Sequence, residues 1–190
     1  MKKYIILKFT DSNIYLYNSK TKNIIIEKII TKYKIIQNTK IIDIEQFINI
    51  LEKTIKKYKL NNLLLKNKIY ILIPSYYNKT DIFLLNYTFK NLNYYKYYFI
   101  KENTLYDYLL NENNIIIDLW DNYGEKTFYI ENQIVTIPID KKDINITEKQ
   151  LIINNTEQKK HLKNKNVIYL EYKKMPLFQM TIDNIEKDLI

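Results

Sequence analysis

The stretch Lys68–Phe89, KIYILIPSYYNKTDIFLLNYTF, decides the fold that we expect for this chain. Residues Ile69–Ile73 are wholly apolar, which is typical of a strand buried on both faces. A polar break at Pro74–Thr80 follows, and apolar residues then recur at helical spacing. Such a strand–turn–helix unit is the usual place for a loop that holds phosphate. This turn has no glycine, which leaves three interpretations open. It can be a phosphate site, a phosphate site that has lost its function, or a plain turn.

Upstream of this stretch, three apolar runs separated by turn-forming residues predict an antiparallel meander: Tyr4–Phe9, Ile14–Tyr17 and Ile24–Ile30. Asp43 can then cap a helix, with Gln46 at the capping-box position. The apolar side chains that follow share one helical stripe. They are Ile44, Phe47, Ile48, Leu51, Ile55 and Tyr58.

Downstream, the pattern predicts a helix over residues 80–92, a strand at Tyr94–Ile100 and a short helix from Asn103 or Thr104 to Leu110. A second set of strands follows, with tight turns at Gly124 and Glu131, and the tail from Met175 can be a short helix or loose. The region 140–165 is polar apart from an apolar island at Leu151–Ile153. The expected strands are Ile115–Leu119, Phe128–Glu131, Ile134–Ile139 and Val167–Tyr172.

This element order predicts an α/β fold with mixed sheets. Three antiparallel strands followed by parallel crossovers form the ribonuclease-H-like unit, and two such units in tandem form the actin-like fold. We therefore expect an N-terminal ribonuclease-H-like lobe at residues 1–110 and a reduced C-terminal lobe at residues 111–190, with the second lobe truncated.

The composition limits what can be inferred from charge. The chain has one glycine, no cysteine, no alanine and no arginine, so we hypothesise an extremely AT-rich genome. The formal net charge of +9 is typical of a protein with an acidic partner such as RNA. However, all 30 of these cations are lysine, which AT-rich drift also supplies, so we prefer mutational bias on a solvated surface as the explanation of the charge. Without cysteine, disulfides and cysteine chemistry are excluded.

The start of the chain does not predict a signal peptide, because the apolar run Tyr4–Phe9 is short and interrupted by Lys8. No stretch approaches the roughly 18 apolar residues of a membrane span. We expect a soluble cytoplasmic protein with no membrane contact.

Four aspartates at strand ends or turns raise the possibility of ribonuclease-H-type metal chemistry, which needs converging carboxylates. They are Asp11, Asp81, Asp118 and Asp121, with Asp118 the best candidate. A polar residue at a strand end is the simpler interpretation of each. The single histidine, His161, has no partner at metal-ligand spacing. The Lys/Tyr alternation at residues 93–101 fits either a stacking platform for RNA or a half-buried strand. We expect no catalytic, metal-binding or cofactor-binding residue.

The helix at residues 80–92 is apolar on two sides. One stripe holds Ile82, Leu85, Phe89 and Leu92, and a second side holds Phe83, Leu84 and Tyr87. A helix apolar on more than one side requires burial on more than one side. One side can cover the sheet, and the other then requires either an internal neighbour or a partner protein.

Six short segments occur in a distinctive order along most of the chain. They are Ile6–Ser12, Asn38–Asp43, the segment from Pro74, Ile100–Leu105, Ile117–Tyr129 and Val167–Glu171. They resemble, in turn, the motifs ILAIDTS, HSExLLP, PGSFTGLRIG, ISTLEALA, IDARxGEVY and PxYLR of the TsaB family. These are tRNA threonylcarbamoyladenosine biosynthesis proteins related to the glycoprotease/Kae-type proteins.

The third segment departs most from its motif. Pro74, Tyr77, Asn78 and Ile82 fit, but both glycines are gone and Asp81 stands where arginine is usual. Arginine is absent from the whole chain and glycine nearly so, which partly explains the loss. Asp81 at a helix start repels anions, and Tyr76 and Tyr77 would screen the backbone N–H groups of this turn. We therefore expect no nucleotide there.

The resemblance implies an actin-like fold and a non-catalytic role. TsaB-like proteins pair with a catalytic TsaD-like subunit and, with a TsaE-like ATPase, support threonylcarbamoyl transfer to tRNA, which they would contact only indirectly. Pairing uses the two helices of the N-terminal lobe, so we expect interface residues at Phe47, Ile50, Phe83 and Tyr87, and a homodimer is possible in isolation. The alternatives are a degenerate actin-like scaffold of division or secretion machinery and a ribonuclease-H-type nuclease that depends on Asp118.

Overall fold

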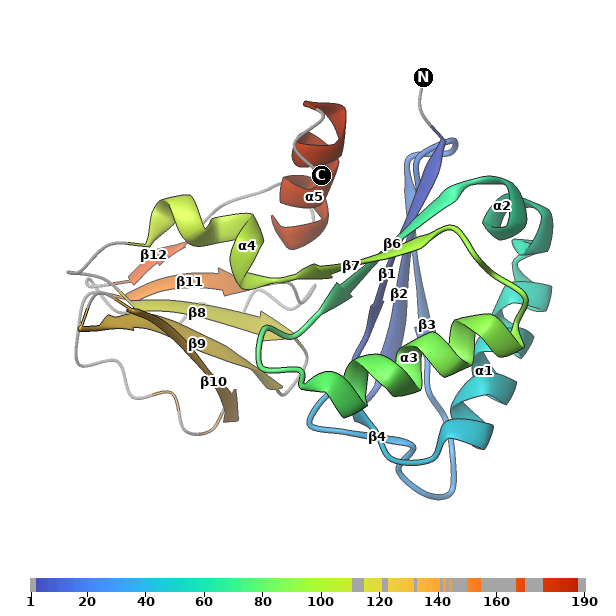
Figure 1. Ribbon diagram of the computed structural model, residues 1–190, viewed down its shortest axis with the longest axis horizontal. Coiled ribbons are helices and arrows are strands. Elements are labelled where there is room, and N and C mark those ends of the chain that lie inside the picture. The colour runs from blue at the N-terminus through green and yellow to red at the C-terminus, as the bar shows by residue number, and fades with distance from the viewer. Residues whose placement is uncertain are drawn as a thin grey trace. The chain divides into compact units, whose positions relative to one another are not determined.

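The stretch Lys68–Phe89 folds as the sequence predicts, into strand β6 (Lys68–Ile73), a turn and helix α3 (Lys79–Asn91) (Figure 1). The computed structural model describes residues 3–110, 115–120, 123–131, 133–140, 142, 144, 150–154, 167–169 and 176–187. β6 is buried from Ile69 to Ile73 and runs parallel to the first strand of the chain. The strand expected to be buried on both faces is therefore confirmed.

The chain divides into two compact units, each built around one five-stranded sheet. The first unit holds residues 1–73 and 77–100, and the second holds residues 74–76 and 101–190. The sequence analysis placed the boundary after residue 110, whereas Lys101–Leu110 lies in the second unit. The buried Tyr106 accounts for this difference, because its hydroxyl donates to Glu125 of the second sheet.

The sheet of the first unit has the strand order β3-β2-β1-β6-β7. Its remaining strands are β1 (Tyr4–Phe9), β2 (Asn13–Asn18), β3 (Asn23–Lys28) and β7 (Tyr97–Lys101). β2 is antiparallel to both β1 and β3, with Leu7 opposite Leu16 and Leu16 opposite Ile25. The predicted meander is therefore confirmed, and the parallel β1–β6 pair makes the sheet mixed.

Helix α1 (Ile44–Lys57) begins at the predicted cap. The Asp43 side chain accepts hydrogen bonds from the Gln46 backbone N–H at 3.0 Å and from its amide at 2.6 Å. On the sheet side, the ring of Phe9 in β1 lies 5.0 Å from that of Phe47 in α1 and 6.4 Å from that of Phe89 in α3. Both helices therefore share one core against the sheet.

Two short features of the first unit were not predicted. Helix α2 (Asn61–Lys66) follows α1 directly, because Lys59 takes a left-handed backbone conformation that ends α1 and lets a new helix begin. The hairpin of β4 (Ile36–Gln37) and β5 (Lys40–Ile41) precedes α1. Strands of two residues carry too little hydrophobic pattern to be recognised in a sequence.

The sheet of the second unit has the order β10-β9-β8-β11-β12. Its strands are β8 (Ile115–Trp120), β9 (Tyr123–Ile130), β10 (Gln133–Asp140), β11 (Gln150–Asn154) and β12 (Val167–Tyr169). β8, β9 and β10 form an antiparallel meander, and β11 is parallel to both β8 and β12. The strand order of the first sheet is thus repeated.

One sequence-based expectation for this sheet was wrong. Gly124 does not mark a turn but lies within β9 opposite Leu119, because its lack of a side chain serves a close approach of two strands. The apolar island at Leu151–Ile153 lies within strand β11, which pairs in parallel with β8. The predicted turn at Glu131 is confirmed.

The helices of the second unit are α4 (Asn103–Tyr106), a 3₁₀ turn η1 (Asp107–Leu109) and α5 (Pro176–Glu186). Of the two possibilities for the tail, residues 176–186 form a helix, which buries Leu177, Phe178 and Ile185. The Phe178 ring packs edge-to-face against Trp120 at 5.9 Å. Among the described residues, no helix is long and apolar enough to cross a membrane.

Candidate functional site

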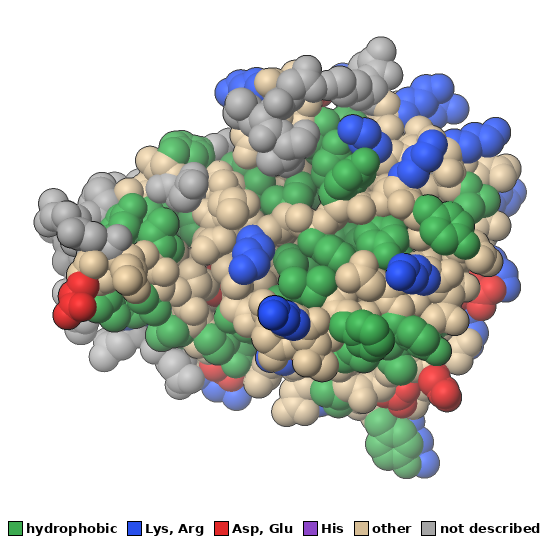
Figure 2. Space-filling model, viewed as in Figure 1, with side chains coloured by type: hydrophobic (Ala, Val, Ile, Leu, Met, Phe, Trp, Pro, Cys, Tyr) green, Lys and Arg blue, Asp and Glu red, His purple; other side chains and the backbone are tan. Residues whose placement is uncertain are grey.

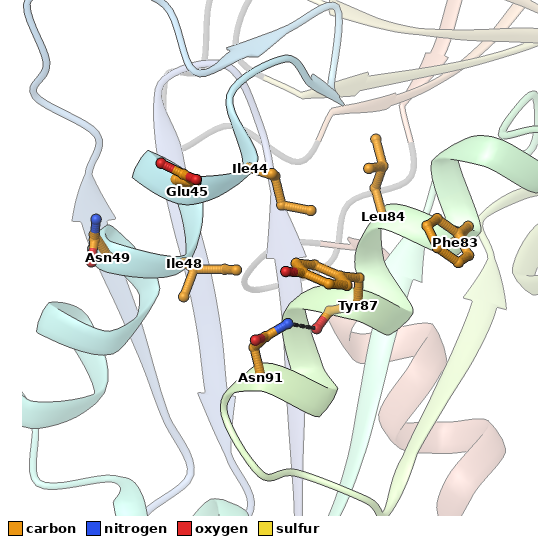
Figure 3. Close-up of a pocket in the computed structure, with 8 residues that line it drawn as sticks. All are labelled: Ile44, Glu45, Ile48, Asn49, Phe83, Leu84, Tyr87 and Asn91. Atoms are coloured by element: carbon orange, nitrogen blue, oxygen red, sulfur yellow. Dashed lines mark hydrogen bonds between the residues drawn. The ribbon is translucent and has the colours of Figure 1, made fainter.

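A groove of about 550 Å³ runs between α1 and α3 in the first unit (Figure 3). Ile44 and Ile48 of α1 and Tyr87 of α3 point toward one another across it, whereas Phe83 lies on the side of α3 away from α1. The lining residues are Ile44, Glu45, Ile48, Asn49, Phe83, Leu84, Tyr87 and Asn91. The groove therefore combines an apolar interior with one carboxylate and two amides.

Two of the four predicted interface residues line this groove and are exposed. Phe83 is 65% exposed and Tyr87 is 48% exposed, which is unusual for aromatic side chains of this size. Ile50 is half-buried and is not among the lining residues. Phe47 is 0% exposed, so its inclusion was wrong: its ring faces Phe9 in the core rather than solvent.

The two apolar sides of α3 differ in their exposure to solvent. Leu85 and Phe89 are buried against the sheet, whereas Phe83 and Tyr87 remain on the surface. Figure 2 shows hydrophobic side chains gathered over α3 on the viewed face, with lysines scattered around them. α1 lies beside α3 but leaves the groove open, so the second apolar side is not covered within the first unit.

The backbone N–H groups at the start of α3 are already engaged. The Asn78 side chain accepts from the N–H of Thr80 at 2.8 Å and of Asp81 at 3.0 Å, and Asp81 accepts from the N–H of Asn78 at 2.9 Å. This capping box uses donors that would otherwise face a phosphate. Asp81 also forms an ion pair with Lys40 at 3.1 Å.

The preceding residues are engaged as well. Tyr77 is buried and donates its hydroxyl hydrogen to the carbonyl oxygen of Thr39. The backbone N–H of Ser75 donates to Glu125 at 2.7 Å. The sequence analysis expected Tyr76 and Tyr77 to screen the N–H groups of this turn, and in the structure the side chains of Asn78, Asp81 and Glu125 accept hydrogen bonds from them.

A cluster of buried carboxylates lies in the second unit. Glu102, Asp118 and Glu125 are each at most 2% exposed, and one carboxylate oxygen of each lies within 4.8 Å of the others. Glu125 accepts hydrogen bonds from the Ser75 hydroxyl at 2.7 Å and from Tyr106 at 2.6 Å. Carboxylates at this spacing can share a proton or hold a cation.

The burial of this cluster changes its protonation. Burial, and then the charge of the nearby Glu102, raise the pKa of Glu125 from its ordinary 4.5 to about 7, although hydrogen bonds from Tyr106 and Ser75 oppose the change. Burial, together with the Glu125 and Asp118 charges, raises the pKa of Tyr106 well above its usual range. Glu125 therefore changes its protonation near neutral pH.

The four aspartates of the nuclease hypothesis do not share one unit. Asp11 and Asp81 belong to the first unit, where backbone N–H groups and Lys40 occupy them. Asp118 belongs to the second unit and meets Glu102 and Glu125, which the sequence analysis did not put forward. Asp121 and His161 lie outside the described residues. Glu102 directly follows strand β7, and a carboxylate at the end of a strand was the sequence signal that could have identified it as a candidate.

The segment at residues 93–101 contains strand β7, as one of its two interpretations predicts. Tyr97 and Phe99 are half-buried, and the Tyr97 ring lies 5.1 Å from Phe89 of α3. Tyr98 and Tyr95 are exposed, at 48% and 74%. The alternation at residues 93–101 therefore reflects a strand with one face partly covered by the core and the other face exposed.

Comparison with known proteins shows the fold. No known protein family and no curated protein sequence matches the chain. Solved structures that resemble it include MreB5 of Spiroplasma citri bound to AMPPNP (TM-score 0.53, 15% identity) and bound to ADP (0.52, 14%). Another is the ethanolamine utilization protein EutJ from Carboxydothermus hydrogenoformans (0.50, 11%).

These matches cover 74% of this chain, and they cover 53%, 52% and 52% of the three solved chains. The chain therefore spans about half the length of the proteins it resembles. Its fold is the actin-like α/β fold, as the element order predicted.

Proposed function

We propose that this chain is a non-catalytic partner subunit of the cytoplasmic complex that forms N6-threonylcarbamoyladenosine in tRNA. It binds a TsaD-like catalytic subunit through the groove between α1 and α3, and a TsaE-like ATPase completes the complex. The observation that carries the proposal is the open groove with exposed Phe83 and Tyr87. The ordered resemblance to TsaB motifs and the actin-like fold support it.

The chemistry of the groove suits an apolar helix of a partner protein. Ile44, Ile48 and Leu84 supply an apolar interior, and Phe83 and Tyr87 supply aromatic rings of the kind enriched at binding hot spots. An amphipathic helix laid into such a groove buries apolar side chains spaced three and four residues apart. Glu45, Asn49 and Asn91 favour amide or basic groups beside that apolar stripe.

The α3 start supports a role without nucleotide binding at this turn. Asn78 and Asp81 use the first N–H groups of the helix for capping, and the Asp81 carboxylate disfavours an anion there. We expect no measurable ATP affinity at this turn in a calorimetric titration. ATP binding that disappears when Asn78 and Lys79 are both replaced would contradict this expectation.

Reconstituted threonylcarbamoyl transfer tests the proposal. The assay combines a TsaD-like subunit, a TsaE-like ATPase and tRNA from the same organism, with and without this chain. Modification is expected to require the chain, and the double substitution Phe83→Asp, Tyr87→Asp is expected to abolish it. Tyr95→Asp is the matched control, because Tyr95 is 74% exposed and does not line the groove. Equal modification without the chain would refute the proposal.

The alternative is an actin-like scaffold of division or secretion machinery. The similarity to MreB5 and EutJ in fold is the observation that favours it. A scaffold assembles into filaments or rings and binds membrane-associated partners. Sedimentation of the isolated chain at increasing concentration separates the two hypotheses, because a partner subunit stays a monomer or dimer while a scaffold forms pelletable polymers.

A further inference from the structure

The β4–β5 hairpin has a turn that its own sequence disfavours. Its two loop residues, Asn38 and Thr39, both have positive φ, at 52° and 62°. Two-residue hairpin turns of this kind prefer Asn-Gly, because glycine has no steric cost at positive φ. Asn38 tolerates this conformation, but the β-branched Thr39 does not. The turn therefore needs support from outside the hairpin.

Asp11 supplies that support. Its carboxylate oxygens accept hydrogen bonds from the backbone N–H of Asn38 at 2.9 Å and of Thr39 at 2.6 Å. Asp11 lies in the turn between β1 and β2, two neighbouring strands of the first sheet, so the sheet anchors it at both ends of that turn. Hydrogen bonds to an ionised acceptor are stronger than neutral ones. The sheet thus holds the hairpin turn in its disfavoured conformation.

The hairpin in turn contacts the starts of both helices that form the groove. At α1, the backbone N–H groups of Ile42 and Asp43 donate to the Ile35 carbonyl at 2.9 and 3.3 Å. Tyr77, just before α3, donates to the Thr39 carbonyl. Lys40 of β5 pairs with Asp81 in the first turn of α3. A change in the turn therefore reaches both walls of the groove.

We propose that Asp11 is a positioning residue for the α1–α3 groove: by holding Thr39 at positive φ, it fixes the spacing of the two helix starts. Its effect on docking rests on the proposed function, whereas its effect on the groove itself does not. Releasing the turn lets Thr39 return to negative φ, which moves the Thr39 carbonyl away from Tyr77 and loosens the start of α3.

Spin-label distances test the effect on the groove without any partner. The chain has no cysteine, so Lys53→Cys on α1 and Lys79→Cys on α3, both exposed, give a unique label pair. The label distance is expected to be narrowly distributed in the otherwise unchanged chain and clearly broader with Asp11→Ala. Glu52→Ala removes a half-exposed carboxylate of α1 that pairs only with Lys56 of the same helix in the described contacts, and it is the charge-matched control. An unchanged distribution in Asp11→Ala would overturn the proposal.

Rescue separates a positioning role from a general loss of stability. Thr39→Gly creates Asn-Gly, which takes the turn conformation unaided. The double variant Asp11→Ala, Thr39→Gly is therefore expected to regain the narrow distribution. Tyr77→Phe keeps the ring and removes only the hydroxyl link to Thr39, so it is expected to broaden the distribution in a well-folded chain, even if Asp11→Ala folds poorly. If Thr39→Gly does not restore the narrow distribution and Tyr77→Phe does not broaden it, the proposal is overturned.

Partner affinity then links the groove to docking. Asp11→Ala is expected to weaken binding of the TsaD-like subunit roughly tenfold, and Thr39→Gly in that background to restore it. If the unchanged chain does not bind that subunit while the label distances respond as expected, the proposed function fails and the positioning role stands. If the chain binds but Asp11→Ala changes neither affinity nor distance, only the positioning role fails.

Discussion

Gly124 is the only glycine of the chain, and it lies where a side chain has no room. A Cβ built on it would lie 1.9 Å from the carbonyl oxygen of Asp118, across the β8–β9 pair. The lack of room for a Cβ gives a steric reason for glycine at this position. The same approach brings Glu125, the next residue, opposite Asp118 in the register.

Gly124→Ala is expected to destabilise the second unit by about 1–3 kcal/mol, because the backbone of β8 or β9 must shift. The fluorescence of Trp120 measures this, since it is the only tryptophan and is buried in that unit. Lys126→Ala, a substitution in the same strand at a half-buried site, is the control. A Gly124→Ala variant as stable as the unchanged chain would show that the strand contact is relaxed.

Glu125 makes the stability of the second unit depend on pH. Its pKa is about 7 in the folded chain and 4.5 in its ordinary state, so between these values the folded state binds more protons than the unfolded state. The resulting stabilisation is complete below pH 4.5 and is lost as the pH rises through 7. It amounts to on the order of 3 kcal/mol.

Urea denaturation followed by Trp120 fluorescence at pH 5 and pH 8 measures this dependence. The unchanged chain is expected to be less stable at pH 8, and Glu125→Gln is expected to remove most of the difference. Glu131→Gln, at an exposed carboxylate, is expected to keep it. A Glu125→Gln variant with the full pH dependence would place the responsible proton on another group.

At the scale of elements, α3 depends on the side chains at its start. Asn78→Ala removes the acceptor for the Thr80 and Asp81 N–H groups and is expected to cost about 1 kcal/mol. Hydrogen exchange of the first-turn amides of α3 measures this directly. Asn78→Asp is the matched control, because aspartate caps equally well. Unchanged protection in Asn78→Ala would mean that packing of α3 on the sheet holds its start.

Elements with a clear hydrophobic pattern or a capping signal were predictable from the sequence, whereas very short strands and an apolar strand within a polar region were not. The meander, α1 with its Asp43 cap, β6 and α3 follow from periodicity and capping signals. The β4–β5 hairpin and β11 were missed because two residues show no period, and a short apolar strand in a polar region resembles an isolated island.

The candidate site was predictable only in part, for a related reason. The doubly apolar character of α3 indicated Phe83 and Tyr87 correctly as surface residues, because helical spacing fixes which side chains share a face. The same rule puts Phe47 on the single apolar stripe of α1, which packs on the sheet, so its choice as an interface residue went against the pattern. The pairing of Asp11 with Asn38 and Thr39 depends on tertiary contacts across more than twenty residues.

At the scale of the whole molecule, the chain repeats one strand order in two units. The orders β3-β2-β1-β6-β7 and β10-β9-β8-β11-β12 both combine an antiparallel meander with parallel pairing to its first strand. This repetition is what the actin-like fold consists of, and it spans about half the length of the solved proteins that share it. The fold alone assigns no chemistry to the chain.

The most direct test of the account is light scattering coupled to gel filtration, with the chain mixed with the TsaD-like protein of its own organism. A one-to-one complex is expected. The double variant Phe83→Asp, Tyr87→Asp is expected not to form this complex, whereas the Tyr95→Asp variant is expected to form it. Separate elution of the unchanged chain and the TsaD-like protein at micromolar concentration would contradict the account.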